Sequence, residues 1–343
     1  MPGRAGPSRR AQRKPGGPAW LRTPQYGNAF SRMKPQSRRR LVYILAFTLI
    51  VVGASVVSYL FGAFSYNREL WPMLNLPAAK KMISPFKAAN GAVTDKFGRL
   101  VGFRGKQSIQ CPHQTDRTMV LLIAGQSNAA NSGGQRYLGR QTVVNYWGGA
   151  CYVASSPLLG ATGVAGDSWT LLGNKLVERQ IADQVILVAT AISGSGVGRW
   201  QDGGDLNIMF RSVISDVAIH YRITQVLWHQ GEWDLAGGMT TAEYVQKFTS
   251  LVESIRRMGI NAPVYVSVAT RCDLTSTLWT ADNPIASAQK AIPDNEKRIF
   301  QGVDTDALVG PLDRTDGCHF AQSGQEKFAE AWVGFLDKHR GNR

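Results

Sequence analysis

Short apolar runs alternate with amphipathic segments along the C-terminal two thirds of the chain. The runs that predict buried strands lie at 119–124, 143–147, 184–191, 225–229 and 263–270. The segments with helical spacing lie at 168–180, 207–221, 240–258, 283–291 and 323–339. This alternation indicates a mostly parallel sheet that is covered by helices on both faces. We therefore expect one α/β domain over residues 115–343.

Four small or polar residues come shortly after these apolar runs. They are Ser127, Gly194 and Gln230, which follow predicted strands, and His319, which follows a last apolar run at 307–309. Binding sites in open parallel sheets lie beyond the carboxyl ends of the strands. The pattern therefore places the four residues at one edge of the sheet.

A serine stands on a glycine-led turn at the end of the first run. The run 119–124 leads directly into Gly125-Gln126-Ser127-Asn128. A strand that delivers a serine onto a tight turn is typical of α/β hydrolases. A serine hydroxyl is a poor nucleophile at neutral pH, so it needs a nearby base and a third group that orients the base. Ser127 is the candidate nucleophile, with Gln126 and Asn128 as candidate supporting residues.

Among the five histidines of the chain, His319 best fits the role of the base. Asp316 precedes it by three positions, so on a loop the carboxylate can contact the imidazole and fix its tautomer. His229 is the alternative base. Alternation along the predicted strand turns His229 away from the side that faces Gln230, which favours a structural role for it.

Acyl transfer also requires hydrogen-bond donors for the negative charge that develops on the carbonyl oxygen. The candidates are the backbone N–H groups of Ser127 and Gly194 and the side-chain amide of Gln230. Gly194 lies in a glycine-rich loop, where the missing side chain lets the backbone approach a ligand closely. The loop lacks the full G-x-G-x-x-G spacing and does not follow the first strand, so a dinucleotide-binding fold is not expected.

Two further carboxylates, Glu232 and Asp234, leave two roles open. Either could orient the histidine in place of Asp316, or it could support Arg199 or the loop that carries Ser127. We favour the supporting role for both.

The four cysteines are Cys111, Cys151, Cys272 and Cys318. None are in C-x-x-C spacing, which disfavours zinc and thioredoxin-like sites. In an oxidising compartment they permit up to two disulfides, with three possible connectivities. Because Cys318 directly precedes His319, a bridge to it would tether the candidate catalytic loop, but its partner stays open.

Three sequence blocks together resemble a known group of enzymes. They are Gly125-Gln126-Ser127-Asn128, the segment Trp-His-Gln-Gly-Glu-Trp-Asp at 228–234 and the segment Asp-Gly-Cys-His-Phe at 316–320. The order of the blocks and their residues resemble those of the SGNH hydrolases, and most of all those of the sialate O-acetylesterase-like carbohydrate esterases. The resemblance covers about residues 117–337.

This resemblance implies a flavodoxin-like three-layer α/β/α sandwich with a mostly parallel sheet. It implies that Ser127 is the nucleophile, that Asp316 and His319 complete the triad, and that Gly194 and Gln230 belong to the oxyanion hole. The implied activity is the removal of acetyl groups from sugar hydroxyls, with no metal and no cofactor.

The positive charge of the chain is concentrated in an N-terminal arm. The formal net charge is +15, and residues 1–40 contain eleven Lys and Arg with no Asp or Glu. The remaining 303 residues hold 28 Lys and Arg against 24 Asp and Glu, so they carry only +4. The arm is also rich in Pro, Gly and Ser, which predicts disorder.

An uncharged segment follows the arm at residues 41–64. A helix of this length spans ~36 Å, enough for a bilayer core of ~30 Å. The run is longer than the apolar part of a signal peptide and lacks a good cleavage site after it. We therefore expect a signal-anchor that leaves the arm in the cytoplasm, with a stem or linker at 65–114. The catalytic domain is then expected beyond the cytoplasmic (inner) membrane, in the periplasm or outside the cell.

Basic arms also bind nucleic acid, but the adjacent apolar segment explains this charge as a topology signal, so no nucleic-acid partner is expected. The expected partners are the membrane and an O-acetylated carbohydrate. Two other functions stay open, namely a polysaccharide O-acetyltransferase that uses the same triad and a non-catalytic glycan-binding protein of the envelope.

Overall fold

The computed structural model describes residues 91–272 and 279–339, together with residues 43–49, 51–53, 55, 57 and 58 near the N-terminus. The chain divides into two compact units, residues 1–81 and residues 82–343. Each unit is considered by itself.

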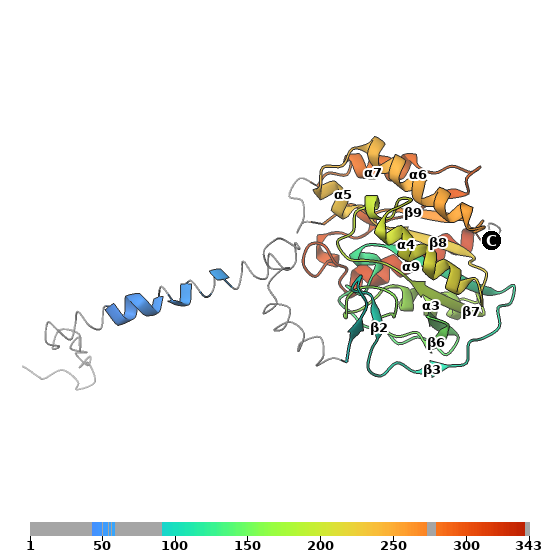
Figure 1. Ribbon diagram of the computed structural model, residues 1–343, viewed down its shortest axis with the longest axis horizontal. Coiled ribbons are helices and arrows are strands. Elements are labelled where there is room, and N and C mark those ends of the chain that lie inside the picture. Colours follow the sequence, from blue (N-terminus) through green and yellow to red (C-terminus); the bar gives the residue numbers. More distant parts are fainter. Residues whose placement is uncertain are drawn as a thin grey trace, which may run out of the picture. The chain divides into compact units, whose positions relative to one another are not determined.

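An eight-stranded sheet forms the centre of the second unit (Figure 1). Its strands are β3 (Ser108–Ile109), β4 (Thr118–Gly125), β5 (Val143–Trp147), β6 (Ala150–Val153), β7 (Gln184–Ala189), β8 (Gln225–His229), β9 (Val264–Val268) and β10 (Ile299–Asp304). They are arranged in the order β10-β9-β8-β4-β7-β5-β6-β3. All pairs from β10 to β5 are parallel, while β6 and β3 extend the β5 edge in antiparallel pairing. The sheet is therefore mostly parallel, as the alternating pattern predicts.

Helices cover both faces of this sheet. The helices are α3 (Trp169–Glu178), α4 (Asp205–Val217), α5 (Glu232–Ala236), α6 (Thr241–Arg257), α7 (Pro284–Ala291), α8 (Thr305–Leu308) and α9 (Gln322–Lys338). Along β4, Val120 and Leu122 pack in the core shared with α4, α6 and α7, whereas Leu121 and Ile123 pack in the core shared with α3 and α9. Strand residues alternate between faces. The predicted three-layer α/β/α sandwich with a mostly parallel sheet is confirmed.

Local sequence signals explain where several helices begin. Thr240 caps α6, because its hydroxyl accepts a hydrogen bond from the Glu243 N–H while the Glu243 carboxylate accepts one from the Thr240 N–H. Asn283 caps α7 with its side-chain oxygen, and Pro284 occupies the first helical position. Such caps satisfy N–H groups that have no partner inside the helix.

The last strand of the sheet differs from the sequence expectation. The apolar run at 307–309 is not a strand; its first residues lie in the short helix α8, whose preceding residue Asp304 accepts a hydrogen bond from the Ala307 N–H. The strand is β10, which contains partly exposed Phe300 and Gln301. Because β10 is an edge strand, it is not buried on both faces and lacks a continuous apolar run.

The stem expected at 65–114 is described from residue 91 onward, and this part belongs to the sheet domain. Strands β1 (Val93–Thr94) and β2 (Leu100–Gly102) pair in antiparallel fashion as a short hairpin, and Leu100 is fully buried. Strand β3 pairs with β6, and a disulfide joins Cys111 to Cys151. The folded domain therefore begins before residue 115.

In the first unit, the described residues between 43 and 58 are helical and have exposed side chains. No helix among the residues that the structure describes is both long enough and apolar enough to cross a membrane. The basic arm 1–40 and part of the predicted span 41–64 lie outside the described residues.

Replacing Gly125 with alanine is expected to disrupt the end of β4. Gly125 has φ +134°, and a Cβ there would lie 2.0 Å from the His229 carbonyl oxygen. We expect Gly125→Ala to lower the free energy of unfolding by at least about 3 kcal/mol, measured by chemical denaturation. Gly334→Ala in α9 is the control, because a Cβ there has open space and should add ~0.5–1 kcal/mol of stability. Equal unfolding curves for the two variants would contradict this account.

Candidate active site

Ser127 begins a short 3-10 helix directly beyond β4. The turn is fixed by a 3.0 Å hydrogen bond from the Gln126 N–H to the His229 carbonyl on the neighbouring strand β8. Ser127 is 6% exposed. Within residues 91–272 and 279–339, neither its hydroxyl nor its backbone N–H makes a hydrogen bond. Both groups are therefore free to act on a substrate.

The side chain of Asn128 joins the serine turn to the loop that carries His319. Its Nδ2 donates to the Cys318 carbonyl at 3.2 Å and to Glu232 Oε1 at 3.0 Å. Its Oδ1 accepts from the Phe320 N–H at 3.2 Å. One amide thus holds the backbone on both sides of His319, which places the histidine beside the serine turn.

Asp316 orients the ring of His319. Asp316 Oδ2 lies 2.7 Å from His319 Nδ1, while Oδ1 accepts from the N–H groups of His319 at 2.8 Å and Cys318 at 3.0 Å. Burial opposes ionisation of Asp316, but these hydrogen bonds and the imidazole hold its pKa below the usual range. The ionised carboxylate accepts from Nδ1–H, which leaves Nε2 of the ring as the basic nitrogen.

A disulfide between Cys272 and Cys318 ties this loop to the chain beyond β9. The guanidinium of Arg314 also donates to the Cys318 carbonyl at 2.5 Å and lies over the Phe320 ring. The histidine loop is therefore cross-linked and hydrogen-bonded on both sides. With the Cys111–Cys151 bridge, these two disulfides settle the pairing that the sequence left open.

Gln230 is fully buried and its amide is occupied by protein partners. Its Nε2 donates to Asp234 Oδ2 at 2.6 Å and to the Ser195 carbonyl at 3.1 Å, and the Tyr244 hydroxyl lies 3.0 Å from Oε1. These bonds fix the loops around the serine and leave no amide hydrogen for a substrate. The geometry therefore favours a structural role for Gln230 instead of the oxyanion role predicted from the sequence.

The backbone supplies the remaining oxyanion donors. Gly194 has φ +68°, and no described residue accepts a hydrogen bond from its N–H. Together with the free N–H of Ser127 it forms the pair of candidate donors. Their role in catalysis stays a prediction.

Asp234 and Arg199 have separate partners. Asp234 Oδ2 accepts from the Val197 N–H at 2.9 Å, which holds the glycine-rich loop in place. Arg199 pairs with Asp205 at 2.7 Å on the surface. Asp234 thus takes the supporting role that we favoured, but Arg199 is held by Asp205 and not by Glu232 or Asp234.

Glu232 supports the serine turn through Asn128 and is 1% exposed. Burial raises its pKa to about 7, a shift that the Asn128 hydrogen bond and Arg314 reduce. Asp316 occupies His319 Nδ1, so Glu232 does not orient the histidine directly. The supporting role is the one that the geometry favours.

His229 does not have the environment of a catalytic base. It is 1% exposed, packs against the rings of Phe320 and Phe328, and neither ring nitrogen has a hydrogen-bond partner among the described residues. Burial and the nearby Arg314 lower its pKa to about 3. A neutral, enclosed imidazole packs as an aromatic ring, which agrees with the structural role favoured from the sequence.

Sequence reasoning underestimated two residues. Asn128 was expected only as a neighbour of the nucleophile, yet it makes the contacts that assemble the site. Arg314 was missed entirely, although it binds the carbonyl next to the histidine. The signal for Asn128 was that it directly follows the candidate nucleophile. Its hydrogen-bond partners are far away in the sequence, so the sequence alone could not predict them.

Comparison with known proteins identifies the family. Residues 117–334 match the family described as "Carbohydrate esterase, sialic acid-specific acetylesterase". The chain belongs to this family. It is accordingly a carbohydrate O-acetylesterase in class, and the serine turn and the histidine loop both lie inside the matched region. No curated protein gives a significant match to the chain.

Solved structures share the fold at low sequence identity. A protein from Arabidopsis thaliana is 14% identical with a TM-score of 0.51, and the match covers 65% of this chain and 98% of that one. NanS is 18% identical with a TM-score of 0.44, over 66% of this chain and 99% of that one. A carbohydrate acetylesterase from Xanthomonas citri is 13% identical with a TM-score of 0.42, over 66% and 57%. At this identity the likeness to the Arabidopsis thaliana protein shows the fold alone.

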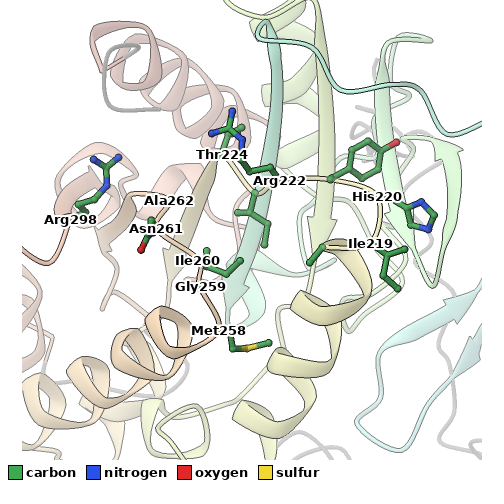
Figure 2. Close-up of a pocket in the computed structure, with 13 residues that line it drawn as sticks. Ile219, His220, Arg222, Thr224, Met258, Gly259, Ile260, Asn261, Ala262 and Arg298 are labelled. Atoms are coloured by element: carbon green, nitrogen blue, oxygen red, sulfur yellow. The ribbon is translucent and has the colours of Figure 1, made fainter.

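A cavity of about 760 Å³, shown in Figure 2, has none of the candidate catalytic residues in its lining. It is lined by the loops before β8 and β9, at 218–224 and 258–262, and by Arg298 before β10. These are the amino ends of the strands, whereas Ser127 lies beyond a carboxyl end. The cavity is therefore not part of the candidate active site. In the described parts of the chain, no three potential metal ligands lie together.

Replacing Glu232 with glutamine is expected to remove a pH dependence of stability. The ordinary pKa of 4.5 applies to the unfolded chain, and burial raises the folded pKa to about 7. Between these values the folded protein keeps a proton that the unfolded chain loses, so the free energy of unfolding falls as the pH rises and then levels off. Glu232→Gln should escape this loss and gain ~1–3 kcal/mol relative to the wild type between pH 4.5 and 8.

The measurement is urea denaturation across this pH range. Glu253→Gln, at an exposed position of α6, is the matched control and should follow the wild type. Parallel curves for Glu232→Gln and the wild type would show that Glu232 ionises normally in the folded protein.

Proposed function

We propose that the protein removes O-acetyl groups from a carbohydrate through a Ser127–His319–Asp316 triad and an acetyl-enzyme. The observation that carries this proposal is the double attachment of the histidine loop. Asp316 fixes the imidazole at 2.7 Å, and Asn128 holds the backbone on both sides of His319 next to the serine turn. Membership of the carbohydrate esterase family supports the substrate class.

In the first half of the reaction, Ser127 Oγ attacks the ester carbonyl while His319 Nε2 takes its proton. The oxyanion accepts hydrogen bonds from the N–H groups of Ser127 and Gly194. Collapse of the tetrahedral intermediate breaks the bond to the sugar oxygen, which takes the proton from His319. The acetyl group stays on Ser127.

In the second half, His319 takes a proton from water as the water attacks the acetyl-enzyme. Collapse releases acetic acid and returns the proton to Ser127 Oγ. Asp316 stays ionised throughout and stabilises the imidazolium, in agreement with its lowered pKa.

We also propose that residues 41–64 anchor the enzyme in the inner membrane, with the catalytic domain in the periplasm. The segment is uncharged. Among its described residues, Thr48 and Ser55 donate their hydroxyls to the Ile44 and Val51 carbonyls one turn earlier, both at 2.8 Å. Such bonds satisfy hydroxyl groups in lipid. Two disulfides in the catalytic domain suit an oxidising compartment.

Ser127→Ala is expected to abolish acetate release. The test measures acetate freed from acetylated xylan and from acetylated sialic acid by the full-length protein in detergent. Loss of the nucleophile should lower kcat by at least ~10³-fold, because the remaining groups cannot form an acetyl-enzyme. Ser250→Ala is the control: Ser250 lies on α6 and binds the Asp202 N–H, away from the site, and its loss should leave release unchanged. Equal turnover by Ser127→Ala would refute the proposed nucleophile, and acetyl transfer to added glycan without acetate release would identify a transferase.

The topology is tested with alkaline phosphatase fused after residue 65, which is active only outside the cytoplasm. High activity is expected for this fusion because the basic arm should stay inside. A fusion after residue 40, which lacks the apolar segment, is the control and should be inactive. An inactive fusion after residue 65 would place the catalytic domain in the cytoplasm and contradict the proposed anchor.

A further inference from the structure

Trp233 is the most solvent-exposed tryptophan that the structure describes. It lies in the first turn of α5, and 38% of its surface is exposed, whereas Trp169, Trp200, Trp228 and Trp332 are fully buried. Trp233 is thus not needed to fill the core.

The backbone of Trp233 is attached directly to the serine turn. Its N–H donates to Gln126 Oε1 at 3.1 Å, and Gln126 is the residue before Ser127. The two residues next to it in the chain are Glu232, which binds Asn128, and Asp234, which binds the glycine-rich loop. These hydrogen bonds therefore hold the backbone of Trp233 in a defined position beside the candidate catalytic loops.

The indole lies along the glycine-rich loop that supplies the second oxyanion donor. A Cβ at Gly194 would be 3.9 Å from Cε3 and Cζ3 of the indole, and a Cβ at Gly196 would be 3.1 Å from its Cδ1. The two glycines therefore leave the space that the ring occupies. This contact places the indole within one residue of the Gly194 N–H.

The exposed indole has unused binding capacity. Its Nε1–H donates to no acceptor in the described part of the chain, and no described aromatic ring stacks on it. An aromatic face carries partial negative charge, and the C–H face of a pyranose ring is apolar with partial positive charge on its hydrogens. An indole can thus bind a sugar by its face and a sugar hydroxyl by its N–H.

We propose that Trp233 is the binding platform for the pyranose ring that carries the acetyl ester. This inference rests on the proposed function, and it assigns to one side chain the discrimination between a glycan ester and a small ester. The sugar ring lies against the indole, which brings the ester carbonyl to the N–H groups of Ser127 and Gly194. A small aliphatic acetyl ester such as ethyl acetate has no ring to place against the indole and gains little from this contact.

Kinetics on two substrates test the platform. The probes are acetylated xylo-oligosaccharides and ethyl acetate, which has neither a sugar ring nor an aromatic ring, with the full-length protein in detergent. We expect Trp233→Ala to raise KM for the oligosaccharides about tenfold at similar kcat, and to change kcat/KM for ethyl acetate less than twofold. Trp233→Phe keeps an aromatic face but loses the N–H, so its KM for the oligosaccharides should lie between that of the wild type and that of Trp233→Ala.

Ile208→Ala is the matched control, because Ile208 is an exposed apolar residue of α4 that has no place in the site. It should behave as the wild type on both substrates. Equal losses on both substrates in Trp233→Ala would show a structural role and overturn the proposal. Unchanged kinetics on both substrates would overturn it as well.

Binding separates a failure of this inference from a failure of the proposed function. Calorimetric titration of the oligosaccharides into Ser127→Ala and into Ser127→Ala/Trp233→Ala requires no turnover. The wild type could hydrolyse neither substrate while Trp233→Ala, added to Ser127→Ala, weakens oligosaccharide binding about tenfold. This result would support the role of Trp233 in binding and refute the esterase mechanism. Equal binding by the two variants overturns the platform, whatever the catalytic result.

Discussion

The site depends on one side-chain amide, that of Asn128. Its three hydrogen bonds join the serine turn after β4, the first turn of α5 and the histidine loop before α9. These segments come from distant parts of the sequence, and the sheet alone brings them only to a common edge. Removing the amide would leave a buried carboxylate, a carbonyl and an N–H without this partner, and unsatisfied buried groups cost more than the bond itself contributes. The amide therefore converts a shared edge into a defined distance between the nucleophile turn and the base.

Two carboxylates support this region, Glu232 bound to the Asn128 amide and Asp316 inside the histidine loop, and their environments move their pKa values in opposite directions. Asp316 is partly exposed and accepts two backbone hydrogen bonds, so its pKa lies below the usual range. Glu232 is enclosed, and burial raises its pKa to about 7. The first is suited to hold an imidazolium, while the second stabilises the turn without placing a full negative charge in the core. At Asp316 the hydrogen bonds and the imidazole outweigh the effect of burial, whereas at Glu232 burial outweighs its hydrogen bonds, so the surroundings and not the residue type separate the two carboxylates.

The central strands and most helices could be predicted from the sequence because their signals are local. Strand β4 is buried on both faces and contains the continuous apolar run 119–124, and α6 is marked by its capping residue Thr240. The edge strand β10 lacks such a run and was missed. The candidate residues Ser127 and His319 could be placed at one edge by the strand pattern, but the partners of Gln230 could not be predicted. They come from three other segments, and only the folded backbone shows that they leave its amide no free hydrogen.

The side-chain amides around the serine turn bind other parts of the protein, and this limits how the site can select its substrate. Gln126, Asn128 and Gln230 all bind other loops of the protein, so they fix the geometry of the site and leave the oxyanion to backbone donors. Backbone N–H groups are rigid and preorganised, which suits stabilisation of a transition state. They recognise only the carbonyl oxygen, which every acetyl ester has in common. Discrimination between esters must therefore come from side chains around the rim, where the rest of the substrate lies.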